Sequence, residues 1–115
     1  MLCGAKSVQY TNYPNNVVHK FYKQASKFGV EVFCAFNYLN YINNLKLSID
    51  SAVSTGGFLE GTLSHTGGIS DPKKGKCDLE YFIKLTRDIS NMGVHSLAIN
   101  NTTSLLNPRS ATMLL

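Results

Sequence analysis

The sequence is poor in cysteine, has no tryptophan and lacks a long apolar run. Its cysteines, Cys3, Cys34 and Cys77, are odd in number and form no CxxC pair, so they indicate neither a disulfide framework nor a zinc site and favour a reducing, intracellular compartment. No apolar stretch approaches the roughly 20 residues that span a bilayer. The opening residues, MLCGAKSV, lack the features of a signal or transit peptide. The sequence therefore predicts a soluble protein without a membrane partner and leaves its compartment unknown.

A strong excess of either charge is also missing, because 11 Lys and Arg residues stand against 7 Asp and Glu, for a net charge of +4. Lysines gather in residues 20–27, within a predicted helix, and in residues 73–76, within a predicted loop. Basic helix faces are usually solvated surface, and this footprint is weak for a nucleic-acid site. We therefore expect no nucleic-acid partner.

Apolar residues are present in ordinary amounts, at 43% of the chain, with 16% charged residues. This composition is typical of a folded globular domain. The 115 residues can build one core, but a complete eight-stranded α/β barrel needs roughly 250 residues. The sequence therefore predicts one domain over residues 1–115, with room for only part of such a barrel.

The apolar pattern alternates between helical spacing and short strand-like runs. Stripes of helical period predict helices over residues 17–28, 42–53 and 79–92, ended by Gly29, Gly56-Gly57 and Gly93, with Asp78 as the N-cap of the third. Short apolar runs predict strands over 30–36, 58–66 and 94–99, and Asn107-Pro108 starts a last helix. Strands and helices that alternate about every thirty residues indicate parallel βαβ units and an α/β fold.

Side chains alternate within two of the predicted strands, residues 59–66 and 96–100. Bulky aliphatic residues lie on one face and small or polar residues on the other. The bulky set consists of Leu59, Leu63, Leu97 and Ile99. This arrangement is expected where bulky residues meet helices and the opposite face lines a barrel interior.

Four ordered blocks carry a resemblance to a known family. They are QYTNYPNNVVHKF (9–21), VEVFCAFNYLNYINNL (30–45), EGTLSHTGGISDP (60–72) and VHSLAINNTTSLLNP (94–108). Together they resemble the carboxyltransferase domain of the pyruvate carboxylase family. The resemblance implies a partial TIM barrel of about four parallel βα units, roughly the third to sixth strands of the family barrel.

The resemblance also implies a chemistry: biotin-dependent carboxyl transfer to pyruvate, giving oxaloacetate, beside a divalent metal (Zn or Mn) held by an Asp, two His and a carbamylated Lys. Of these ligands only the Lys position falls within the chain, where it is Asn100, and the family's next residue, an Asp, is Asn101. A neutral, shorter amide cannot replace an anionic carbamate at a divalent ion. We therefore expect no metal and no cofactor on this chain.

Other family positions at the strand ends are altered as well. Cys3 stands at the pyruvate-binding Arg position, while Tyr10 matches a family Tyr near the substrate. A thiol cannot supply the charged fork with which Arg binds a carboxylate. The remaining positions expected at the strand ends are Lys6, Cys34 (a family Arg), Asn37 (a family Asp), His65 (a family Tyr) and Thr66. None of them is a carboxylate.

Four functional interpretations remain open; besides the three that follow, one is a working enzyme that retains the parental activity, which would need a metal-ligand set of adequate charge and geometry. The first is a truncated, inactive derivative of the family barrel. The second is an interaction module that associates with itself or with a full-length pyruvate carboxylase, because a partial barrel leaves sheet edges unpaired. The third is a flavodoxin-like phosphate or nucleotide module that uses Thr66-Gly67-Gly68, a turn without the glycine spacing of known phosphate loops. Two residue roles also stay open. Cys34 is either a reactive thiol or a packed side chain, and His65 has either a chemical role or a packing role.

Overall fold

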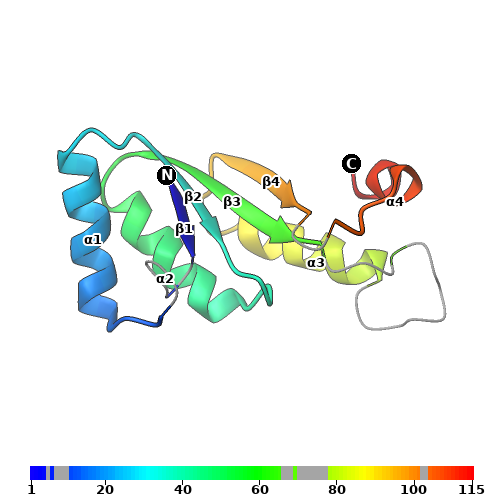
Figure 1. Ribbon diagram of the computed structural model, residues 1–115, viewed down its shortest axis with the longest axis horizontal. Helices are drawn as coiled ribbons and strands as arrows, with labels where there is room; N and C mark the ends of the chain where they lie inside the picture. Colours follow the sequence, from blue (N-terminus) through cyan, green and yellow to red (C-terminus); the bar gives the residue numbers. More distant parts are fainter. Residues whose placement is uncertain (5, 7–10, 66–68, 70–77, 102–103) are drawn as a thin grey trace.

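The structure is a computed structural model that describes residues 1–4, 6, 11–65, 69, 78–101 and 104–115. It contains four strands, each followed by a helix (Figure 1). The strands are β1 (Leu2–Gly4), β2 (Val32–Phe36), β3 (Phe58–Ser64) and β4 (Ser96–Asn100), and the helices are α1 (Asn15–Lys27), α2 (Ile42–Val53), α3 (Leu79–Ser90) and α4 (Pro108–Leu114).

The strands form one parallel sheet in the order β1-β2-β3-β4, which is also their order in the chain. Neighbouring strands are in register through rows such as Leu2, Cys34, Glu60 and Ser96. The α/β fold predicted from the apolar pattern is confirmed. A doubly wound, flavodoxin-like sheet reverses its strand order at a switch point, and the described strands show no such reversal.

The strand boundaries differ slightly from the predicted ones, and the first strand was given no range by the apolar pattern. Strand β2 begins at Val32 rather than Val30 because Val30 takes part in the capping motif that follows α1. The Val30 N–H donates to the Ala25 carbonyl (3.0 Å) and the Gly29 N–H to the Ser26 carbonyl (3.0 Å), with Gly29 at φ +94°. These two bonds are a Schellman motif, which needs a residue in the left-handed region after the helix.

Two helix starts follow the predicted capping residues. The Asp78 carboxylate accepts a hydrogen bond from the Tyr81 N–H (2.9 Å), and the Asn107 side-chain oxygen accepts one from the Ser110 N–H (2.8 Å). Each cap satisfies an N–H that has no partner within its helix. Pro108 lies in the first turn of α4, where proline costs no hydrogen bond.

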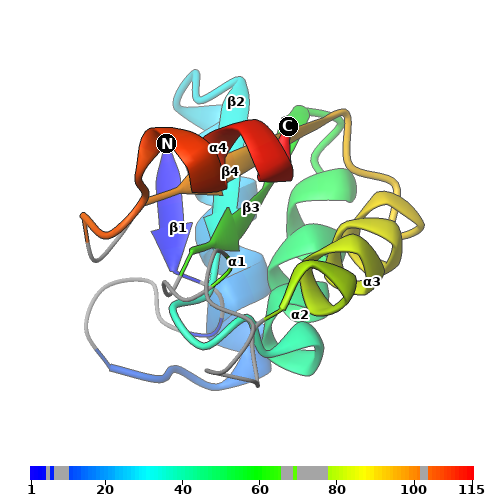
Figure 2. The ribbon, with the colours of Figure 1, turned by 90° about the vertical axis from the view of Figure 1, so that its right-hand side faces the viewer.

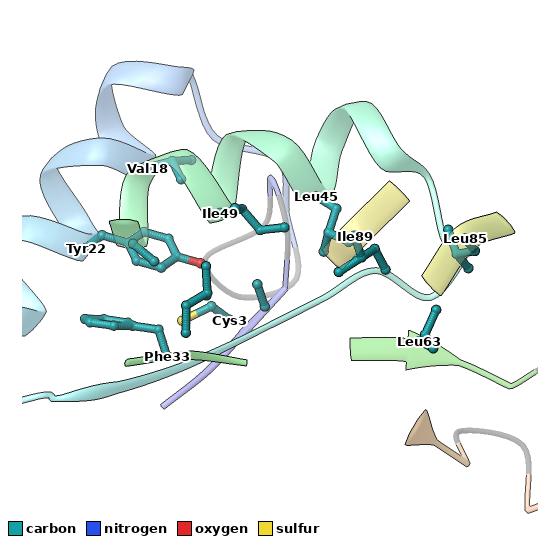
Figure 3. Close-up of a cluster of buried hydrophobic side chains, with 12 residues drawn as sticks. Cys3, Val18, Tyr22, Phe33, Leu45, Ile49, Leu63, Leu85 and Ile89 are labelled. Atoms are coloured by element: carbon teal, nitrogen blue, oxygen red, sulfur yellow. The ribbon is translucent and has the colours of Figure 1, made fainter. Parts of the chain in front are cut away.

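The core lies between one face of the sheet and helices α1, α2 and α3 (Figures 2 and 3). Strand residues such as Phe33 and Leu59 pack there against Val18 and Ile49 of the helices. The predicted stripe of α1 is partly wrong, because its end residue, Phe28, is 83% exposed. Tyr22, which the predicted stripe did not include, is buried, and its ring centroid lies 5.2 Å from that of Phe33.

Helix α3 approaches β3 closely at Gly61. A Cβ atom at this position would lie 2.5 Å from Cγ2 of Ile89 and 3.0 Å from Cγ1 of Val94. Both atoms belong to β-branched side chains, which have little rotamer freedom to move aside. Glycine at this position therefore sets the distance between the sheet and its third helix.

The opposite face of the sheet is not covered by α1, α2 or α3. It carries the strand residues that alternate with the core residues, and its amino-terminal part is apolar and exposed: Leu2 is 64%, Val32 49% and Phe58 45% exposed. We call this surface the open face. None of the helices that the structure describes is both long and apolar enough to cross a bilayer.

Candidate functional site

The carboxyl ends of the four strands lie along one edge of the sheet, as parallel pairing requires (Figure 1). The structure brings Asn37, His65, Asn100 and Asn101 to this edge, directly after β2, β3 and β4. Lys6 follows β1 and is half-buried, and its carbonyl accepts a hydrogen bond from the Tyr13 N–H (3.1 Å). The predicted positions Tyr10 and Thr66 lie outside the described residues.

Asn100 and Asn101 end β4 with neutral amides. Asn100 is half-buried, belongs to the open face and is in register with Ser64, and its carbonyl accepts the His65 N–H (2.8 Å). The Asn101 side-chain oxygen accepts the Leu106 N–H (3.2 Å), which shapes the loop that leads to α4. The position that the resemblance assigns to an anionic metal ligand therefore holds an uncharged side chain.

Asn37 closes the turn that follows β2. Its side-chain oxygen accepts the N–H groups of Leu39 (2.9 Å) and Tyr41 (3.2 Å), and its carbonyl accepts the Ser64 hydroxyl (3.0 Å). An Asn side chain that binds the backbone two residues further on is a common turn device. Its role in this chain is to shape the turn.

Asn40, in the same turn, was not identified by the sequence reasoning. It is 8% exposed and has φ +52°, a conformation that Asn tolerates better than most residues. Its side-chain NH₂ donates to the Ser64 carbonyl and its side-chain oxygen accepts the Ser64 N–H, both at 2.8 Å. The amide thus pairs with the last residue of β3 as a neighbouring strand would. The only sequence signal was the pair of asparagines in the turn after a strand.

His65 is packed away from solvent. Its imidazole is 1% exposed and stacks on the Phe82 ring of α3, with the ring centroids 6.0 Å apart. Burial lowers the pKa of this imidazole, because the charged form loses its hydration. A buried, stacked ring fits the packing interpretation better than a chemical role.

Cys3 points into the core rather than onto the open face. It lies beside Tyr22 and Phe33 (Figure 3) and is 3% exposed. Burial raises the pKa of its thiol, and burial likewise raises the pKa of the Tyr22 phenol. The position that the resemblance assigns to pyruvate-carboxylate binding therefore holds an apolar contact.

Cys34 lies on the open face in register with Glu60. Its sulfur is 3.1 Å from the Thr62 hydroxyl oxygen. Burial is the main cause that raises the pKa of the Cys34 thiol, and a hydrogen bond with the Glu60 carboxylate raises it further. A reactive cysteine needs a lowered pKa, so this environment disfavours the reactive-thiol interpretation.

The described residues offer no donor set for a metal ion. No three His, Cys, Asp or Glu side chains gather within the part of the chain that the structure describes. The amides and hydroxyl at the strand ends are neutral, whereas divalent ions in such edges are held by carboxylates and imidazoles. The metal site implied by the resemblance does not fit these residues.

Known proteins match the chain over almost its whole length. Mitochondrial pyruvate carboxylases of Mus musculus and Homo sapiens are 43% and 42% identical over 114 residues, or 99% of this chain. Among solved structures, the Rhizobium etli carboxyl transferase domain with pyruvate and the same domain with pyruvate and biocytin each superpose with a TM-score of 0.93 at 36% identity, over 99% of this chain. No protein-family profile matches.

This chain is related to the carboxyltransferase domain of pyruvate carboxylase. The relation covers one segment of that enzyme, because the chain spans 10% of the length of the mouse and human relatives and 20% of the solved domain with pyruvate. It confirms the predicted partial TIM barrel, since the four βα units superpose on that carboxyltransferase structure.

We predict that Asn40→Ala lowers the free energy of unfolding by about 2–4 kcal/mol, because the Ser64 backbone N–H and carbonyl lose their partner in a buried place. Asn40→Gly keeps the positive φ accessible and should lose most of the same stability. Urea unfolding measures both, with Asn43→Ala, an exposed change in α2, as the matched control. A glycine variant as stable as the wild type would show that the amide contributes nothing.

A second prediction concerns pH. Because the folded-state pKa of His65 is lowered, the unfolded chain binds a proton below about pH 6.5 that the folded chain does not, so stability falls as pH falls from about 7 to 5. His65→Tyr keeps an aromatic ring against Phe82 and removes this titration. Its unfolding free energy should therefore fall less over the same range, as measured by urea unfolding at each pH. Equal losses in the two proteins would refute the assignment.

Proposed function

We propose that this chain is part of a carboxyltransferase barrel that has kept the fold of its relatives but cannot catalyse their reaction. The observation that carries the proposal is the neutral amide of Asn100 at the end of β4. A metal-assisted reaction needs an anionic ligand set to hold the cation, and the cation in turn stabilises an enolate. Neither charge requirement is met by the described side chains at this edge.

The surroundings of the other substituted positions support the proposal. Cys3 contributes an apolar contact inside the core, and Asn37 is engaged in shaping a turn. Both side chains are thus engaged within the fold. The two cysteines among the described residues are free thiols, which supports a reducing, intracellular setting.

The proposal predicts no carboxyl transfer. The purified chain, given pyruvate and carboxylated biotin or biocytin, should form no oxaloacetate, and it should not decarboxylate oxaloacetate. A titration with Mn²⁺ should show no site of one equivalent. An intact pyruvate carboxylase carboxyltransferase domain serves as the positive control in the same assay. Turnover above the background without enzyme, or one bound Mn²⁺ per chain, would overturn the proposal.

A second candidate function is association with another polypeptide, either a copy of this chain or a full-length pyruvate carboxylase. The observation that favours it is the open face of the sheet, where the apolar side chains of Leu2, Val32 and Phe58 are exposed. Exposed apolar surface drives association.

Sedimentation velocity of the chain, alone and mixed with an intact pyruvate carboxylase, tests this candidate. The expected result is that the chain sediments faster than a monomer in at least one of the two samples. Serum albumin in place of the carboxylase controls for nonspecific capture. A monomer in both samples would remove the candidate.

A further inference from the structure

We draw no further inference here: the strongest candidate, the turn after β2 that exposes the apolar side chains of Tyr38, Leu39 and Tyr41 on a backbone held by Asn37 and Asn40, carries none, because nothing in the described part of the structure shows what covers it.

Discussion

The sheet is covered unequally on its two faces, because the second face is buried only toward the carboxyl ends of the strands, at Phe36, Thr62 and Ser64. Helices α1, α2 and α3 bury one face in a continuous core around Phe33, Leu59 and Ile49. The other face keeps Leu2, Val32 and Phe58 in contact with solvent. Parallel sheets in known proteins have both faces buried. In a complete barrel this face would line the interior, while the chemistry would take place at the carboxyl ends of the strands.

At the carboxyl edge of the sheet, neutral side chains support the structure at positions where the related enzymes have charged ones. Its amides are engaged with the backbone: Asn37 binds two N–H groups of its own turn, and Asn40 pairs with both backbone groups of Ser64. Buried polar groups are costly only when they lack partners. Neutral side chains therefore hold the strand ends in place at a position where catalysis would demand ions.

The sequence predicted the order of the elements, the capping residues Asp78 and Asn107, and the α/β class, because each of these depends on local spacing or on one side chain. It was less accurate where contacts between distant parts of the chain determine the position of a residue. Val30 has a strand-like neighbourhood, yet the end of α1 binds its N–H. Cys3 matches a binding position along the chain, yet the short β1 turns it toward Tyr22. Asn40 gave almost no signal, because its role depends on Ser64, 24 residues further along the chain.

The sequential strand order has a consequence for how the chain is assembled. Each new strand joins the edge left by the previous one, so no strand has to insert between two others. The sheet can therefore grow vectorially during synthesis, one βα unit at a time, and every intermediate presents a fresh edge to its surroundings. Until the next strand pairs with it, that edge is open to aggregation, so the time between the synthesis of one strand and the next determines how long the edge is exposed.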